Sequence, residues 1–218
     1  MIDSYSEPRY GFSDLVELVR VLRAPDGCPW DRVQTHRSIR RNFIEEVYEA
    51  CEAIDLDNAD LLREELGDVL LHVVFHAGIE ADRGRFTIDD VCHTVVEKMI
   101  SRHPALFGGD ASLSWDELKR REKGQATLSQ ELDSVARSLP ALWRAEKLQS
   151  KAQKAGYALP APPAPSEDPA AQVGELLFSA VRLALSQGID PEQALHQRCD
   201  AFLAEVRSEE SCQDVPHQ

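Results

Sequence analysis

The stretch FIEEVYEACEAIDLDNADLLREELGDVLLHVVFHA, residues 43–77, determines how we interpret the whole chain. Apolar residues recur in it at intervals of three and four, which is typical of amphipathic helices. We expect helices over 38–54 and 59–82, joined near Asp57 as an antiparallel hairpin. Alternating β-branched runs are almost absent from the rest of the sequence, so it predicts an all-α fold.

Two acidic pairs lie on this predicted hairpin. Glu46 and Glu49 are three residues apart on the first helix, and Glu65 and Asp68 are three apart on the second, so each pair shares one helix face. Position 57 is midway between 49 and 65 and also midway between 46 and 68, so the pairs should lie level across the hairpin. Helices packed about 8 to 10 Å apart would then bring four carboxylates to one site.

Such a group of carboxylates needs a positive partner, because two unit charges about 4 Å apart repel by roughly 4 kcal/mol at an effective dielectric constant near 20. An all-oxygen ligand set suits Mg²⁺, with Mn²⁺ as the alternative. A solvated helix face is the commoner explanation of a single acidic pair, but two level pairs beside apolar residues favour a metal site.

Two histidines, His72 and His76, continue the Asp68 face at four-residue spacing. A zinc or di-iron site would require an H-E-x-x-H or E-x-x-H pattern, and neither helix contains one. We therefore interpret these histidines as core or supporting residues and not as metal ligands.

The composition limits the partners. With 24 Lys and Arg against 38 Asp and Glu, the formal net charge of -14 argues against a nucleic-acid groove. We expect no membrane partner and a cytoplasmic location, because no apolar run approaches spanning length and residues 1–12 do not resemble a leader. Five cysteines without a C-x-x-C pair predict buried free thiols in a reducing compartment.

Turn and cap signals predict the remaining helices and the domain organisation. Pro25 and Gly27 end a first helix, Thr87 is a helix N-cap, and Ser114 with Glu117 forms a capping box. We expect the other helices over 13–23, after 87, after 114, from 140 to 156, over 170–186 and over 191–206. The predicted organisation is a main domain over 1–157, a Pro/Ala-rich linker over 158–169, a helical half-repeat over 170–207 and a polar tail over 208–218.

The half-repeat is defined by a faint internal similarity. Residues 65–91 and 172–195 share the order apolar, glycine, acid, apolar run, turn and new helix. In the second copy Gln172 stands in place of Glu65 and Glu175 in place of Asp68, and no E-E-x-x-E stretch precedes them. The second copy is therefore a degenerate half of a duplicated unit.

Six segments together resemble the MazG family of nucleoside triphosphate pyrophosphohydrolases. They are GCPWDRVQTHRSI, EEVYEACEAID, EELGDVLLHVVFHA, EKMISRHPALF, SWDELKRREK and SLPALWRAEKLQSKAQKAGY. The similarity extends over about residues 13–157, and E-E-x-x-E followed by E-x-x-D is the metal signature of that family.

The resemblance implies an all-α helical bundle with a dimeric core. It also implies Mg²⁺-dependent hydrolysis of NTP or dNTP to the monophosphate and diphosphate, in nucleotide-pool housekeeping. Glu46, Glu49, Glu65 and Asp68 would hold the metal. Lys98 and Arg102 would contact the triphosphate, although they could also form a solvated helix face.

Further residues receive roles from the same resemblance. Trp115 matches a base-stacking position and Lys119 a phosphate-binding one, although Trp115 could instead anchor a core. Trp30 and Gln34 are weaker substrate-binding candidates, because C-P-W-D could serve only as a structured turn. For Glu45 we hypothesise a catalytic role in orienting or deprotonating the attacking water, with Glu46 or Glu64 as alternatives.

Two other functions remain open at this stage. One is a narrow hydrolase for dUTP or dCTP. The other is a non-catalytic helical scaffold that retains cation binding and uses its acidic C-terminal half-repeat to dock a partner.

Overall fold

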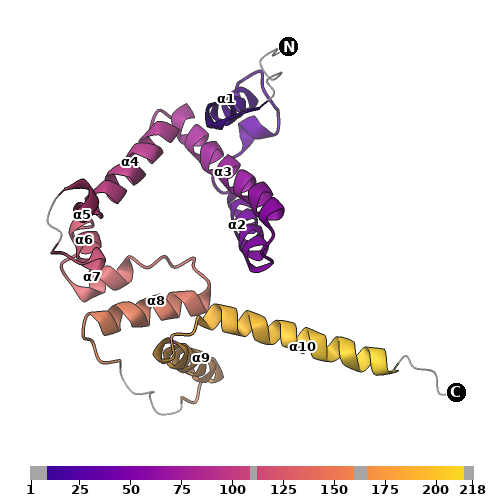
Figure 1. Ribbon diagram of the computed structural model, residues 1–218, viewed down its shortest axis with the longest axis vertical. Helices are drawn as coiled ribbons and strands as arrows, with labels where there is room; N and C mark the ends of the chain where they lie inside the picture. Colours follow the sequence, from indigo (N-terminus) through magenta and orange to yellow (C-terminus); the bar gives the residue numbers. More distant parts are fainter. Residues whose placement is uncertain (1–8, 109–111, 160–165, 214–218) are drawn as a thin grey trace. The chain divides into compact units, whose positions relative to one another are not determined.

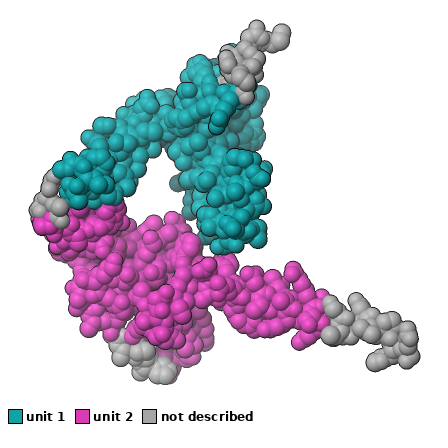
Figure 2. Space-filling view, in the orientation of Figure 1, with its two compact units in different colours: residues 1–111 teal, residues 112–218 magenta. Residues whose placement is uncertain are grey.

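The computed structural model describes residues 9–108, 112–159 and 166–213. These residues form α-helices and one 3-10 helix, with no strand among them, which confirms the all-α prediction (Figure 1). The chain divides into two compact units, residues 1–111 and 112–218 (Figure 2). No helix within the described ranges combines the length and the apolar character that crossing a membrane would need.

The first unit contains the predicted hairpin. Its elements are α1 (Phe12–Arg23), η1 (Asp31–Val33), α2 (Arg40–Asp55), α3 (Ala59–Asp82), α4 (Ile88–Ser101) and α5 (Pro104–Phe107). Helices α2 and α3 lie side by side (Figure 1). Between them Asp57 has a left-handed φ of 50°, and the Asn58 side chain caps α3 by accepting from the Leu61 amide at 3.1 Å. The buried residues of α2 are Ala50 and Ala53, whose small side chains allow the two helices to approach closely.

A small apolar core holds α1 against α3. The buried cluster consists of Val19, Ile39, Val74, Phe75 and Ile79, with Leu15, Val16, Leu71 and Ile88 packed around it. Burial of such side chains contributes about 1.5 to 3 kcal/mol each. This core lies along the C-terminal part of α3, so it fixes the helix that carries half of the acidic residues.

The second unit is organised around α8. Its helices are α6 (Trp115–Glu122), α7 (Leu128–Asp133), α8 (Ala141–Lys154), α9 (Pro169–Ser186) and α10 (Pro191–Gln213). The amide of Gln149, which is 1% exposed, donates to the carbonyl oxygen of Phe178 on α9 at 2.8 Å. The Trp143 ring nitrogen donates to Asp190 at 3.1 Å. Both contacts attach the predicted half-repeat to α8. The predicted domain boundary near residue 157 stays a prediction.

The cap predictions are confirmed, since Thr87 and Ser114 each accept a hydrogen bond from the third helical residue of α4 and α6. The predicted end of the last helix at residue 206 is wrong, because α10 continues to Gln213 through a stretch that contains neither glycine nor proline. The short helices α5 and α7 were not predicted, since they are too brief to show a helical period.

The prediction of buried thiols is also wrong. Cys51, Cys92 and Cys199 are exposed and Cys28 is half-buried, although all four are free. On α2 the reason is local: Ala50 and Ala53 face the hairpin, and Cys51 follows Ala50 by one residue, about 100° around the helix. The side chain of Cys212 lies outside the described residues.

Candidate metal centre

Three of the four predicted metal ligands converge between α2 and α3. Glu46, Glu49 and Glu65 each offer a carboxylate oxygen, and these oxygens lie within 4.8 Å of one another. Glu65 is buried at 9% exposure, Glu46 is half-buried and Glu49 is exposed. The cluster is therefore closed on the α3 side and open to solvent on the α2 side.

The carboxylates raise one another's pKa values. For Glu46 burial is the main cause, followed by a hydrogen bond with Glu49 and by the negative charges of Asp68, Glu49 and Glu65. The Glu65 pKa is raised mainly by burial, then by the charges of neighbouring acids, with Glu49 first. Without a cation this cluster therefore binds protons more readily than isolated glutamates do.

The fourth predicted ligand, Asp68, is not among the three residues whose oxygens meet within 4.8 Å. It is half-buried one turn further along α3. Its charge nevertheless raises the pKa of both Glu46 and Glu65, so its carboxylate lies near the cluster. The donor set of three clustered oxygens with a fourth nearby fits a hard divalent cation.

The proposed water-orienting residue lies outside this cluster. Glu45 is exposed on α2, and Arg41 donates from Nε to its Oε1 at 2.9 Å. This ion pair is solvent-exposed and holds the carboxylate beside the cluster on a different face of the helix. The catalytic role of Glu45 stays a prediction, as does that of the alternative Glu64, which is also exposed.

The predicted substrate-binding cations lie on two different units. In the first unit, Lys98 is half-buried in the last turn of α4 and Arg102 is the C-cap of the same helix. In the second, Trp115 begins α6 and the Lys119 ammonium lies 5.7 Å from the centre of its ring. Such a contact is a cation–π interaction and pairs an aromatic surface with a positive charge.

Comparison with known proteins identifies the family. The model of the MazG nucleotide pyrophosphohydrolase domain matches residues 34–107, which contain the whole carboxylate cluster. The nucleoside triphosphate pyrophosphohydrolase/pyrophosphatase MazG of Thermotoga maritima is 40% identical, with 91% of this chain and 85% of that protein covered. The chain belongs to the MazG family. The predicted resemblance is thereby confirmed.

This chain matches only part of the length of some other relatives. The nucleoside triphosphate pyrophosphohydrolase of Escherichia coli K12 is 38% identical over 151 residues, which is 66% of this chain and 57% of that protein. The protein of the same printed name from Mycobacterium tuberculosis is 36% identical, with 90% of this chain and 57% of that protein covered. The chain thus spans a little over half the length of these two relatives.

The histidines of α3 lie beside the carboxylate cluster. His72 Nε2 is 3.9 Å from Glu46 Oε1, while His72 Nδ1 is buried without a hydrogen-bond partner among the described residues. Burial lowers the pKa of His72, and the charge of Asp68 opposes this effect. A neutral ring beside Glu46 agrees with the interpretation of His72 as a supporting residue.

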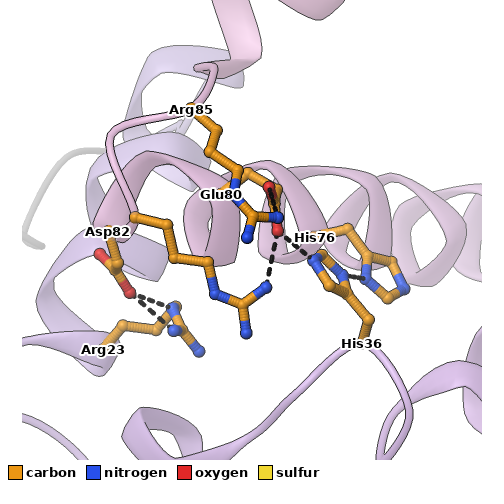
Figure 3. A network of polar contacts seen from close by, with 7 residues as sticks. Arg23, His36, His76, Glu80, Asp82 and Arg85 are labelled. Atoms are coloured by element: carbon orange, nitrogen blue, oxygen red, sulfur yellow. Dashed lines mark hydrogen bonds and ion pairs between the residues drawn. The ribbon is translucent and has the colours of Figure 1, made fainter.

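Sequence reasoning missed a polar network that starts from His76 (Figure 3). His36, which precedes α2, stacks on His76 with ring centres 5.0 Å apart and with the two Nδ1 atoms at 2.8 Å. Its Nε2 lies 2.6 Å from Glu80 Oε1. Because an ionised carboxylate can only accept hydrogen bonds, His36 Nε2 carries the proton in its contact with Glu80. When both rings are neutral, His76 Nδ1 is then the donor to His36.

Glu80 is the centre of this network. It is 5% exposed and receives hydrogen bonds from Arg83 at 2.8 Å and Arg85 at 3.1 Å as well as from His36. These contacts, with that of His36 first, lower the pKa of Glu80 to about 2. The signal was present in the sequence, since Glu80 continues the four-residue spacing of His72 and His76.

Arg23 fixes the connection between α1 and η1. Its guanidinium pairs with Asp82 at 2.6 Å (Figure 3). It also donates to the Asp31 carbonyl oxygen at 3.0 Å and lies 5.0 Å from the centre of the Phe75 ring. The Gln34 amide donates to the Trp30 carbonyl oxygen at 2.9 Å. Gln34 therefore braces a turn in this structure, while Trp30 as a whole is 62% exposed.

The second copy lacks such a site. Glu175 receives a hydrogen bond from Ser179 at 3.2 Å, and Gln172 donates to the Ser166 carbonyl oxygen. Neither belongs to an acidic group like that of the first copy in the part of the chain that the structure describes. Their local contacts agree with the interpretation of the half-repeat as degenerate.

Proposed function

We propose that this family member hydrolyses nucleoside triphosphates to the monophosphate and diphosphate with Mg²⁺, or Mn²⁺, as its cofactor. The observation that carries the proposal is the convergence of Glu46, Glu49 and Glu65. Support also comes from the names of the relatives, which describe nucleoside triphosphate pyrophosphohydrolases. Cytoplasmic housekeeping of the nucleotide pool would be the biological setting.

The donor set fits the proposed metal. Glu46, Glu49 and Glu65 would hold it, with Asp68 as a fourth ligand. The raised pKa values of Glu46 and Glu65 support this assignment, because the same excess of negative charge that attracts a proton attracts a divalent cation. When bound, Mg²⁺ would offset the charge of the phosphates and polarise the phosphorus.

In the proposed reaction a water oxygen bonds to the α-phosphorus while the bond to the bridging oxygen of the diphosphate breaks. Glu45 would orient the water and accept its proton. Lys98 and Arg102 would bind the triphosphate, and the positive charge of each would stabilise the leaving diphosphate. Trp115 would stack on the base, with Lys119 binding a phosphate.

A homodimer is part of the proposal. Apolar side chains are exposed on α2, where Val47 is 41% and Tyr48 is 45% exposed. They are exposed on α4 as well, where Val95 is 43%, Val96 is 53% and Met99 is 42% exposed. Exposed apolar surface of this kind is typical of an interaction site, and a second copy of the chain would cover it. Sedimentation of the intact chain tests this part.

The activity is tested by measuring diphosphate release from a panel of NTPs and dNTPs, with Mg²⁺ and with EDTA. We expect metal-dependent release with the monophosphate as co-product, and the ranking of substrates distinguishes a broad hydrolase from one restricted to dUTP or dCTP. Glu49→Gln should be inactive. A folded, dimeric sample that releases no diphosphate from any nucleotide would favour the non-catalytic scaffold.

A further inference from the structure

The second unit contains a polar pocket of about 830 Å³ between α6, α7 and α8, and none of its lining residues belongs to the carboxylate cluster. Six of the 24 Lys and Arg residues of the chain line it, together with four acids. The cations are Lys119, Arg120, Lys123, Lys147, Lys151 and Lys154, and the acids are Asp116, Glu117, Glu131 and Glu146. A local excess of positive charge in a chain of net charge -14 requires an explanation.

Ion pairs neutralise part of this charge. Lys154 pairs with Asp116 at 2.9 Å, and Arg120 pairs with Glu131 at 3.3 Å. Glu117 accepts from the backbone amide of Ser114 at 2.8 Å and thereby caps α6.

Four of the six lining cations, Lys119, Lys123, Lys147 and Lys151, are in neither of these ion pairs, and two lining acids, Glu117 and Glu146, remain to offset them. Lys119 already lies against Trp115 and is not needed for the argument. The unneutralised part of the pocket is therefore positive.

The arrangement on α8 concentrates this charge. Lys147 and Lys151 are four residues apart, so they share one face of the helix, and Ser150 lines the pocket between them. Like charges at this spacing disfavour an isolated helix by about 0.2 to 0.5 kcal/mol. A multivalent anion bound between the two ammonium groups would reverse this effect.

We propose that this pocket binds a small anion that carries two or more linked phosphates, held by Lys123, Lys147 and Lys151. A volume of about 830 Å³ lies within the range of small-molecule sites, and the separate ammonium groups match several charges and not one. Lys119 of the proposed substrate site also lines the pocket, but binding through Lys123, Lys147 and Lys151 needs neither the metal nor the carboxylates, so the inference goes beyond the proposed hydrolysis.

The test is calorimetric titration of the intact chain with inorganic tripolyphosphate in EDTA, so that no divalent cation occupies the carboxylate cluster. We expect binding that weakens with salt. The double variant Lys147→Gln, Lys151→Gln should weaken it by about tenfold or more, because each charge-assisted contact contributes substantially to affinity. Both side chains line an open pocket, and circular dichroism confirms that the variant is folded.

The matched control is the double variant Arg63→Gln, Arg121→Gln. It removes the same two charges from exposed positions that do not line the pocket, and it should bind as the unaltered chain does. Lys98→Gln should also retain the metal-free binding of tripolyphosphate, since Lys98 does not line the pocket. These controls separate the pocket from the overall charge and from the triphosphate contact proposed for Lys98.

Several results would overturn the inference. The chain could fail to bind tripolyphosphate, or bind a single-stranded oligonucleotide instead. The control variant at Arg63 and Arg121 could weaken binding as much as the variant at Lys147 and Lys151 does. Binding could also be lost in Lys98→Gln and kept in the variant at Lys147 and Lys151. Metal-dependent diphosphate release is measured separately. If the chain hydrolyses nucleotides but does not bind tripolyphosphate, only the proposal of an anion pocket is wrong. If it binds tripolyphosphate but does not hydrolyse nucleotides, only the proposed function is wrong.

Discussion

Replacing Glu49 by Gln should change stability and activity in opposite directions. Glu49 is exposed, and its carboxylate oxygen lies within 4.8 Å of those of Glu46 and Glu65. In the absence of metal this proximity is repulsive, so a neutral amide of the same shape relieves it. The variant should therefore be more stable than the unaltered protein in EDTA and inactive in Mg²⁺.

The magnitude follows from the distance. For the pair Glu46 and Glu49, whose oxygens lie at most 4.8 Å apart, two unit charges at that limit repel by about 0.9 kcal/mol at the dielectric constant of water, which suits the exposed Glu49. Salt reduces this value further. Relief of the repulsion from Glu46 alone should raise the free energy of unfolding of the metal-free variant by about 0.5 to 1 kcal/mol, and relief of the repulsion from Glu65 adds to this gain.

Urea unfolding followed by circular dichroism measures this change, in EDTA and again with Mg²⁺. The metal should stabilise the unaltered protein by about 2.7 kcal/mol at a concentration one hundred times its Kd, and Glu49→Gln should lose most of this gain. Glu52→Gln is the matched control, since it removes an exposed acid from the same helix outside the cluster. It should retain both metal stabilisation and hydrolysis.

Two results would refute the reasoning. If Glu49→Gln lowers the stability of the metal-free protein while Glu52→Gln does not, the Glu49 carboxylate stabilises the fold and is not repelled by its two neighbours. If Glu49→Gln hydrolyses nucleotides at the unaltered rate, Glu49 does not hold the metal, and the site must be sought elsewhere.

Three further predictions concern the fold around the site. Because the pKa of Glu80 falls from 4.5 unfolded to about 2 folded, its contacts stabilise the protein above pH 4.5 and are lost as the pH falls toward 2. Urea midpoints measured over this range should fall less steeply with falling pH in Glu80→Gln than in the unaltered protein. Equal pH dependence in the two proteins would contradict the proposed effect of the network. Gly27→Ala should destabilise the protein by about 1 to 3 kcal/mol in urea unfolding, because the added Cβ would meet two carbonyl oxygens of α1. Gly174→Ala is the control, because a Cβ there meets nothing within 4 Å and should not destabilise the protein. Ile79→Ala, at a position 2% exposed in the core, should cost about 2 to 5 kcal/mol by the same assay, and a loss below about 1 kcal/mol would show that the core tolerates the cavity.

Much of the first unit follows from the sequence by itself. The period of three and four predicts α2 and α3, and the turn signal at Asp57 and Asn58 is sufficient to predict that they form a hairpin. The same spacing places Glu49 level with Glu65, and Glu46 level with Asp68, on facing helices. These features are local, because the residues that determine them lie within a few turns of one another.

The tertiary structure alone decided what the distant parts of the chain do together. His36 meets His76 and Glu80 across 40 and 44 residues, and no helical period relates a residue before α2 to the end of α3. The cationic pocket likewise combines α6 with α8, so Lys123 and Lys151 share a cavity that neither segment predicts. Packing between non-adjacent helices depends on how the side chains of one helix face fit against those of another. The spacing of residues within a single helix does not encode this fit.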